Sequence, residues 1–452
     1  MRRFSQLWVL PVLILTPAFA RSVPKPDPNV PKVAYTSYTL PNGLRVFFSR
    51  DTTAPVVSVN LVYNVGSFVE PPGRTGFAHL FEHMMFQGSK NVGKGEHTQL
   101  VIDNGGTMNG GTSFDFTVYY ETVPANQLEL ALFLEADRMG TLDVSQVNLD
   151  NQRAVVKEER RMRYENQPYG TIGEHLQDLA YIKSPYKHVP IGSMDDLNRA
   201  DLAYVRRFFH TFYAPNNAVL CVAGDFDPAR AKALIAKYYG RIKRGPKPVL
   251  PSLSEPPQKA ERRVAYKDKL APLPTYVAGY HIPNGNDKDA PALDMLSSIL
   301  SGGKSARLWQ SLVEKQQVCT SVSSGANAGR GPDLFSFRMA FGPGQSVEKA
   351  EKALYAEIQK IQKDGVTHEE MQTARTQALQ SSIEGRRTSL GRAMAIGISA
   401  VVYGDPNRVN TELSRFYAVT AADVKRVARK YLVSTNRSVV IAEAGAARGG
   451  AQ

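Results

Sequence analysis

The 452-residue chain contains little cysteine and little histidine. Its two cysteines, Cys221 and Cys319, lie far apart, and Cys221 falls in a stretch that reads as a buried strand. We therefore expect no disulfide framework. With eight histidines in the chain, a chance match to a short histidine motif has odds of about one in a hundred, so such a match carries information.

Beyond its N-terminus the sequence also lacks any apolar run of the roughly 20 residues needed to cross a bilayer. The N-terminus, MRRFSQLWVLPVLILTPAFARS, combines Arg2 and Arg3 with a shorter apolar stretch and a small-residue site that ends at Ala20. This combination is typical of a cleaved signal peptide. We expect residues 1–20 to be removed near Ala20 and the mature protein to be periplasmic or secreted, with no transmembrane segment.

Positive charge is in excess, because 55 Lys and Arg residues face 42 Asp and Glu residues, for a net charge of +13. The basic residues are dispersed, and no basic run stands beside stacking aromatic residues. This pattern argues against a nucleic-acid partner. The charge is interpreted as a solvated surface that suits acidic peptides or the face of a membrane.

The chain is too long for one hydrophobic core. Residues 241–258 contain five prolines and little periodicity, which indicates a linker. We expect an N-terminal domain at 33–240, a Pro-rich linker at 241–263, a homologous C-terminal domain at 264–445 and a flexible tail at 446–452. Strand-like stretches such as LRVFFSR alternate with long helices, which predicts an α+β class with mixed, largely antiparallel sheets.

The motif GFAHLFEHMMFQGS, residues 76–89, places two histidines and a glutamate on an apolar helix. His79, Glu82 and His83 share one face because they stand at positions i, i+3 and i+4. Such polar groups are costly in an apolar setting unless something compensates them, and a zinc ion held by the two imidazoles would do so. The alternative is a set of hydrogen-bonded core residues. The order HxxEH inverts the common HExxH and is the inverzincin signature.

A catalytic zinc needs a third protein ligand. The stretch NQRAVVKEERRMRYENQPYG, residues 151–170, predicts a charged helix with a narrow apolar stripe at Val155, Val156 and Met162. Glu158 lies one turn after Val155, and Glu159 has nearly the same relation to Val156. Periodicity alone leaves both glutamates open.

These motifs resemble the pitrilysin family of zinc peptidases, which includes insulin-degrading enzyme and the mitochondrial processing peptidase. In that family a glutamate about 75 residues after HxxEH, in an apolar-apolar-x-Glu stretch, completes the site. His83 to Glu158 spans 75 positions, so the resemblance selects Glu158. A second glutamate, two helical turns earlier in many relatives, corresponds to Asn151.

The resemblance runs from about Tyr35 to Ala442. It includes GGTMNGGTSFDFTVYYETVP, residues 105–124, where the family has an edge strand that holds substrate, and this carries a substrate-binding role to Asn109. YAPNNAVLCVAGDF, residues 213–226, resembles the strand that closes the family's first domain.

The resemblance implies a zinc endopeptidase with one Zn²⁺ per chain, bound by His79, His83 and Glu158. Glu82 would act as the general base that activates a water molecule. The substrates would be extended peptides or small unfolded polypeptides in a chamber between the two domains. The alternative is a non-catalytic scaffold or assembly subunit of the same fold, and the intact motif favours the enzyme.

The second half resembles the first without its ligands. VARKYLVSTNRSVVIAEAG near the C-terminus resembles VRRFFHTFYAPNNAVLCVAG at the end of the first half. SGGKSARLWQSLVEK resembles FQGSKN. Alignment of the two halves at this element places Leu293, Leu296 and Ser297 opposite the HxxEH residues. We expect the second half to shape the chamber and to perform no chemistry.

Self-sufficient members of the family contribute an arginine and a tyrosine from the second half. In LVEKQQVCTS the corresponding residues are Val313 and Thr320, and neither can donate a charge-assisted hydrogen bond. Arg307 lies upstream as a substitute, although a basic residue on a helix face is the simpler interpretation. We therefore expect a heterodimer in which a homologous subunit without zinc supplies the Arg and Tyr, with a homodimer as the fallback.

Overall fold

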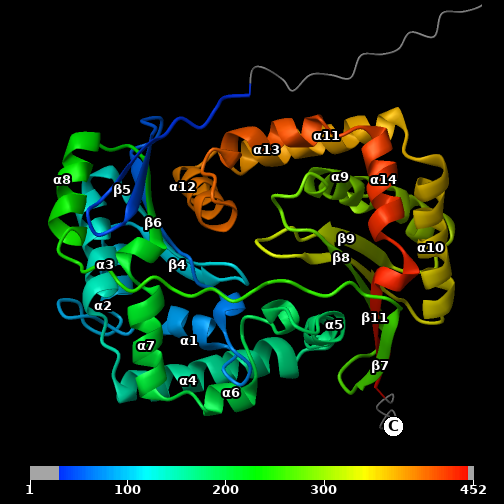
Figure 1. Ribbon diagram of the computed structural model, residues 1–452, viewed down its shortest axis with the longest axis horizontal. Coiled ribbons are helices and arrows are strands. Elements are labelled where there is room, and N and C mark those ends of the chain that lie inside the picture. Colours follow the sequence, from blue (N-terminus) through cyan, green and yellow to red (C-terminus); the bar gives the residue numbers. More distant parts are fainter. Residues whose placement is uncertain (1–29, 446–452) are drawn as a thin grey trace, which may run out of the picture.

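The computed structural model describes residues 30–445, which form two halves, each with one β-sheet (Figure 1). The predicted signal peptide, residues 1–20, and the predicted tail, residues 446–452, lie outside the described residues. None of the helices in the described range has the length and apolar character needed to cross a membrane.

The first sheet has six strands in the order β1-β2-β6-β3-β5-β4. They are β1 (Thr36–Thr39), β2 (Arg45–Arg50), β3 (Val56–Tyr63), β4 (Thr107–Thr112), β5 (Thr117–Pro124) and β6 (Ala218–Gly224). β2 and β6 are parallel, and every other neighbouring pair is antiparallel. All seven residues of β6 are buried, as expected for a strand that is covered on both faces.

The second sheet has five strands in the order β7-β11-β8-β10-β9. They are β7 (Arg262–Asp268), β8 (Thr275–Ile282), β9 (Ser321–Ala326), β10 (Asp333–Ala340) and β11 (Arg437–Ala444). Its one parallel pair is β7 with β11. The order therefore repeats β2-β6-β3-β5-β4 of the first sheet. In each set of five, the strand that comes first in the sequence is parallel to the strand that comes last in the sequence: β2 to β6, and β7 to β11. The predicted α+β class, with mixed and largely antiparallel sheets, is confirmed.

Most helices stay with the sheet of their own half, on its outer side or along its end (Figure 1). In the first half these are α1 (Phe77–Met84), α2 (Glu96–Asp103), α3 (Leu128–Thr141), α4 (Gln146–Arg160), α6 (Met194–Asn198), α7 (Leu202–Phe212) and α8 (Pro228–Tyr239). In the second half they are α9 (Ala290–Ser301), α10 (Val347–Asp364), α11 (His368–Glu384), α13 (Arg408–Tyr417) and α14 (Ala421–Tyr431).

Two helices are exchanged between the halves. α5 (Ile172–Ala180) packs on β7, β8 and β11, and α12 (Ser389–Ile398) packs on β3 and β6. Leu176 of α5 lies in one buried cluster with Val277 and Val440, and Ile396 of α12 lies in another with Val62. Each sheet is therefore covered on its inner face by a helix from the other half, so separation of the halves would expose both sheets.

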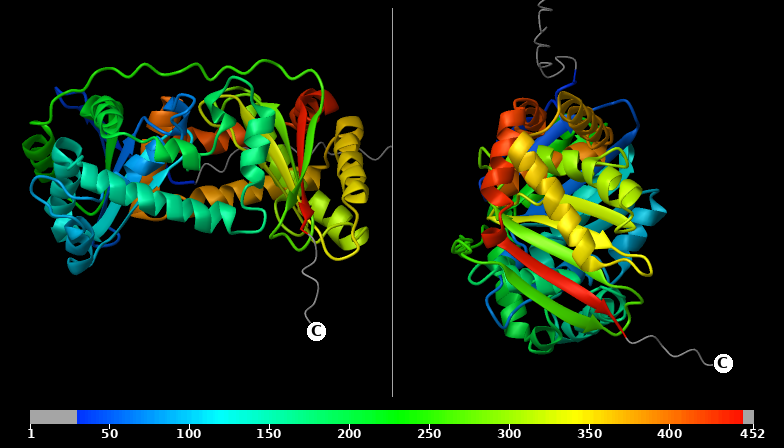
Figure 2. Two further views of the ribbon diagram at one scale, coloured as in Figure 1. Left: turned by 90° about the horizontal axis from the view of Figure 1, so that it is seen from below. Right: turned by 90° about the vertical axis from the view of Figure 1, so that its right-hand side faces the viewer.

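The chain between α8 and β7 has neither helix nor strand and crosses one side of the molecule (Figure 2). It is docked, because Glu255 accepts hydrogen bonds of 2.7–2.9 Å from three consecutive backbone N–H groups that begin at Ile182. The predicted linker, 241–263, extends two residues into β7, which begins at Arg262.

Candidate metal centre

The helix α1 is fixed at its N-terminus by a buried carboxylate. Glu70 accepts hydrogen bonds from the backbone N–H groups of Gly76 (2.9 Å) and Ala78 (2.7 Å). His188 contacts the same carboxylate through Nε2 at 2.8 Å. The first N–H groups of a helix have no partner within the helix. A carboxylate at this end accepts their hydrogen bonds and interacts favourably with the positive end of the helix dipole. The orientation of α1 is thereby set.

The structure brings His79, Glu82 and His83 together on one face of α1. The opposite face is apolar and faces the core, with Phe77, Ala78, Leu80, Phe81 and Met84 buried. One nitrogen of each histidine and one oxygen of Glu82 all lie within 4.8 Å of one another. The helical face predicted from the sequence is the face that the structure presents.

A carboxylate from α4 lies beside the two histidines, and it belongs to Glu159. Its Oε2 lies 3.2 Å from Nε2 of His83 and 3.8 Å from Nε2 of His79. The side chain of Glu158 is 56% exposed and pairs with Arg161 at 2.9 Å. The prediction that Glu158 completes the group is therefore wrong, and Glu159 takes its place.

The error has a physical cause in the rotation of α4. Val156 is fully buried, whereas Val155 is 43% exposed and Met162 is 55% exposed. Successive residues on a helix point about 100° apart, so the stripe that includes Val156 carries Glu159 inward and turns Glu158 to solvent. The apolar stripe predicted from the sequence therefore combined a residue on the buried side of α4, Val156, with two on the exposed side, Val155 and Met162.

The same one-residue shift moves the position two helical turns before this glutamate. It falls on Gln152, which is 6% exposed, and not on Asn151, which lies on the exposed side. Gln152 donates a 2.7 Å hydrogen bond from Nε2 to the side chain of Asn151. An uncharged amide therefore stands where the resemblance places a second acid.

The environment sets the protonation of the site. Burial, and next the neighbouring His83, lower the pKa of His79 to about 4. A hydrogen bond with His83 lowers the pKa of Glu159, and burial raises the pKa of Glu82. A neutral imidazole and an ionised carboxylate are the forms that bind metals.

The donor set fits a zinc ion. Ligand atoms about 2.0–2.1 Å from a tetrahedral zinc stand about 3.3 Å apart, close to the 3.2 and 3.8 Å separations that join Glu159 to the histidines. Nδ1 of His79 and Oε2 of Glu82 are buried without a hydrogen-bond partner. Two histidines and one glutamate also leave one coordination position open, as catalytic zinc sites require.

Arg163 is a site residue that the sequence analysis missed. α4 continues into a π-helical turn, Arg161–Glu165, and Nη1 of Arg163 lies 2.9 Å from Oε1 of Glu159. The two oxygens of Glu159 thus have different partners, the histidines for Oε2 and Arg163 for Oε1. The i,i+4 spacing is the sequence signal that indicates this pair once Glu159 is chosen.

The edge strand β4 lies beside the metal helix. Asn109 is exposed, and its Oδ1 accepts a 2.8 Å hydrogen bond from the N–H of Gly110. A Cβ at Gly110 would lie 3.4 Å from Cγ of Glu82 and 3.1 Å from the ring of Tyr119. The glycine therefore lets β4 approach the histidine-bearing face of α1 closely. Within the described residues, the outer edge of β4 has no neighbouring strand.

A second cluster of ionisable groups lies buried behind α1. Nε2 of His97 lies 2.5 Å from Oε1 of Glu121, and Arg138 forms a two-bond ion pair with Glu135. Burial raises the pKa of Glu121 to about 7. Because Arg138 already supplies a cation and stacks over the ring of Tyr119 at 4.5 Å, we interpret the cluster as an internal ion network and not as a metal site.

In the described second half, the three positions aligned with the HxxEH residues lie on α9. Leu293 and Leu296 of α9 are fully buried, and Oγ of Ser297 lies 3.3 Å from Oγ of Ser324. Within residues 30–445, groups of three potential metal ligands occur in the first half alone. The three aligned positions of α9 are therefore engaged in core packing and in a serine–serine hydrogen bond.

The positions that align with the family's substrate-binding Arg and Tyr are Val313 and Thr320. Val313 packs against the second core, and Oγ1 of Thr320 donates a 3.1 Å hydrogen bond to the carbonyl of Ala340. Arg307, the substitute considered from the sequence, binds Glu370 through two hydrogen bonds of 2.8 and 2.7 Å. The simpler interpretation of Arg307 is therefore the better one.

Two family descriptions match the chain: "Insulinase (Peptidase family M16)" over residues 45–190 and "Peptidase M16 inactive domain" over residues 199–378. Zinc protease PqqE of Helicobacter pylori is 31% identical over 410 residues, which cover 90% of this chain and 92% of that protein. The crystal structure of a protease from Helicobacter pylori superposes with a TM-score of 0.87 at 30% identity, covering 91% of this chain and 99% of that one. The periplasmic protease PqqL from Escherichia coli shares the fold, with a TM-score of 0.75 at 20% identity over 90% of this chain and 47% of that one.

Proposed function

The chain belongs to peptidase family M16, the insulinase family, and we propose that it is a zinc-dependent endopeptidase. The predicted resemblance to pitrilysin-type zinc peptidases is thereby confirmed. One observation carries the proposal: His79, His83 and Glu159 converge through one nitrogen or oxygen each, with a free carboxylate oxygen of Glu82 beside them.

In this proposal the chain holds one zinc ion through Nε2 of His79, Nε2 of His83 and Oε2 of Glu159. When bound, zinc polarises the scissile carbonyl and lowers the pKa of a water molecule. Arg163 holds the second oxygen of Glu159, so that the carboxylate presents Oε2 to the metal. Partners of metal ligands commonly fix their orientation in this way.

Glu82 is the proposed general base. Its carboxylate lies on the same face as the two histidines but is not needed as a ligand, and its Oε2 has no hydrogen-bond partner. Burial raises the pKa of Glu82, which moves the carboxylate closer to the range in which a general base works best. Glu82 takes a proton from the attacking water and passes it to the leaving amine.

The proposed substrate is an extended peptide that pairs with the open edge of β4 near Asn109. Main-chain pairing of this kind accepts many sequences, which suits unfolded polypeptides held in a chamber between the halves. Export to the periplasm or the medium is proposed from the signal-like N-terminus, and the structural neighbour from Escherichia coli that is named a periplasmic protease supports it.

We also propose that a homologous subunit without the zinc motif completes the site, with a homodimer as the fallback. Two observations support a second subunit. Arg307 is ion-paired with Glu370, and Val313 and Thr320 carry no charge. Developing negative charge in the transition state needs strong donors, so the Arg and Tyr would come from the partner.

A second candidate function is a non-catalytic scaffold, because residues 199–378 match a domain described as inactive. The experiment that separates the two is a peptide-cleavage assay on the purified mature chain, alone and with any similar exported protein encoded beside it. Cleavage that stops with a zinc chelator and returns with zinc supports the peptidase. If zinc is bound but no combination cleaves the peptide, the result would favour the scaffold function over the peptidase. Full activity of the isolated monomer would rule out the heterodimer.

A further inference from the structure

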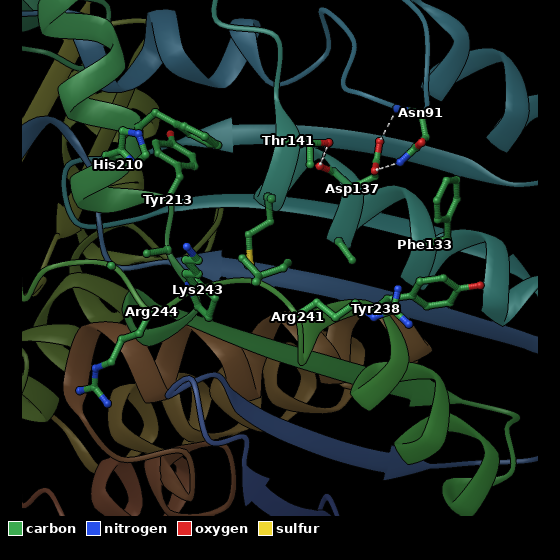
Figure 3. Close-up of a pocket in the computed structure, with 18 of the residues that line it drawn as sticks. Asn91, Phe133, Asp137, Thr141, His210, Tyr213, Tyr238, Arg241, Lys243 and Arg244 are labelled. Atoms are coloured by element: carbon green, nitrogen blue, oxygen red, sulfur yellow. Dashed lines mark hydrogen bonds between the residues drawn. The ribbon is translucent and has the colours of Figure 1, made fainter.

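A pocket of about 740 Å³ lies in the first half where α3, α7 and α8 meet the start of the linker (Figure 3). Its apolar lining includes Phe133, Met139, Phe209, Tyr213 and Ile242. The volume is within the range of about 300–1,000 Å³ that holds small organic ligands. This pocket is separate from the metal centre and plays no part in the proposed peptide hydrolysis.

Three cations from the linker line this pocket. Figure 3 shows Arg244 at one end, Arg241 beside Tyr238 towards the other end, and Lys243 between them. All three are exposed, and in the described part of the chain none of them has an ion-pair partner. Unpaired guanidinium and ammonium groups at the rim of an apolar pocket favour an anionic ligand.

The acidic residue in the pocket is already satisfied. Asp137 accepts hydrogen bonds from Oγ of Ser89 (2.5 Å), from the backbone N–H of Asn91 (3.1 Å) and from Nδ2 of Asn91 (2.6 Å). Figure 3 shows Asp137 turned towards Asn91 and away from the linker cations. Its charge therefore does not neutralise them.

The backbone that carries the cations is fixed. Nδ2 of Asn42 donates to the carbonyls of Tyr239 (2.8 Å) and Ile242 (2.9 Å), and Oδ1 of Asn216 accepts from the N–H of Gly245 (2.8 Å). A Cβ at Gly245 would lie 2.4 Å from Cβ of Ala214, so the linker lies directly on the end of α7. A ligand would meet a rim whose backbone is already ordered, which lowers the entropic cost of binding.

We propose that this pocket binds an amphipathic organic anion, with a phosphate or carboxylate head held by Arg241, Lys243 and Arg244 and an apolar body against the aromatic lining. Its floor is shared with the metal helix, because the rings of Phe209 and Tyr213 lie 5.6 and 4.4 Å from the ring of Phe81. The ligand therefore sits one aromatic layer away from α1.

The test is calorimetric titration of the full mature chain with octyl phosphate below its critical micelle concentration. We expect one ligand per chain. Inorganic phosphate, which lacks the body, and octyl glucoside, which lacks the charge, should each bind at least about tenfold more weakly. The variant with Arg241→Gln, Lys243→Gln and Arg244→Gln should weaken octyl phosphate binding by about tenfold or more, because hydrogen bonds to charged groups are the strong ones.

The matched control removes the same charge elsewhere, through Lys267→Gln, Lys269→Gln and Lys288→Gln, three exposed lysines of the second half. It should retain the affinity of the natural chain within about twofold, since exposed charges at a distance are screened. Equal weakening in both triple variants, binding of several ligands per chain, or tight binding of octyl glucoside would each overturn the proposal. Circular dichroism spectra of both triple variants, compared with that of the natural chain, serve as the check that the variants remain folded.

Discussion

The two halves share one topology but differ in what one helix presents. α1 and α9 each follow the third strand of the repeated order and lie against the edge strand, β4 or β9. α1 carries His79, Glu82 and His83 on that side, whereas α9 carries buried leucines and a serine bonded to a serine. The fold therefore depends on the apolar pattern that both halves keep. The proposed chemistry depends on a few side chains that, among the described residues, stand together in the first half.

The largest effect is expected from Glu82, the proposed general base. Glu82→Gln should lower peptide cleavage by about 10²- to 10⁴-fold, because a positioned general base contributes that much, while zinc content stays the same. The matched change in the other half, Ser297→Ala, should leave cleavage unchanged. Steady-state assays with metal analysis measure both, and normal cleavage by the Glu82 variant would contradict the mechanism.

The next effect concerns the two neighbouring glutamates of α4. Glu159→Gln should weaken zinc binding by about 100-fold or more, since loss of even an outer partner of a ligand costs about 10- to 100-fold. Glu158→Gln should bind zinc like the natural chain because its side chain faces solvent. Competition with a chelator of known affinity measures the difference, and the reverse order would restore Glu158 as the ligand.

The exchanged helices offer a comparison of two glycines. A Cβ at Gly397 of α12 would lie 2.7 Å from Cγ2 of Val62 and 3.1 Å from Nδ2 of Asn60, whereas a Cβ at Gly173 of α5 meets no atom within 4 Å. Gly397→Ala should lower the free energy of unfolding by about 1–3 kcal/mol through overpacking. Gly173→Ala should leave it unchanged or raise it by up to about 1 kcal/mol.

Chemical denaturation of the two glycine variants measures these changes. Equal stability of the two would mean that α12 does not lie tightly on the first sheet, and the exchange of helices would then need revision.

The smallest effect is expected at Arg163. Arg163→Ala should weaken zinc binding by about two- to tenfold, at the low end for a partner of a metal ligand, because its side chain is 72% exposed and exposed ion pairs contribute little. Arg163→Lys should recover most of the affinity. Arg161→Ala, which removes the partner of Glu158, should have no effect on zinc; an equal loss in both alanine variants would remove the positioning role.

The sequence was sufficient for the parts that follow from periodicity. The face of α1 was predictable because three polar residues at helical spacing stand among apolar ones. The similarity of the two halves indicated a duplicated scaffold, although not its strand order. The choice of Glu158 failed because one residue of spacing corresponds to about 100° of helix rotation. The rotation of α4 is visible in the structure, where Val156 is buried and Val155 is exposed.

Other features depend on tertiary contacts that a single sequence does not encode visibly. An amphipathic pattern predicts that α5 and α12 bury one face, but not that each buries it on the sheet of the other half. The pairing of Arg307 with Glu370 joins residues 63 positions apart. The pocket at the linker joins three helices and a stretch without regular structure, so no local pattern indicates it.

The central claim is that one zinc ion lies in the first half, on His79, His83 and Glu159. The most direct test is a crystal structure of the zinc-loaded mature chain with diffraction recorded at the zinc absorption edge. The account predicts one anomalous peak per chain, at about 2.0–2.2 Å from Nε2 of each histidine and from a carboxylate oxygen of Glu159. A peak coordinated by Glu158, a peak at α9, or no peak at α1 would contradict it.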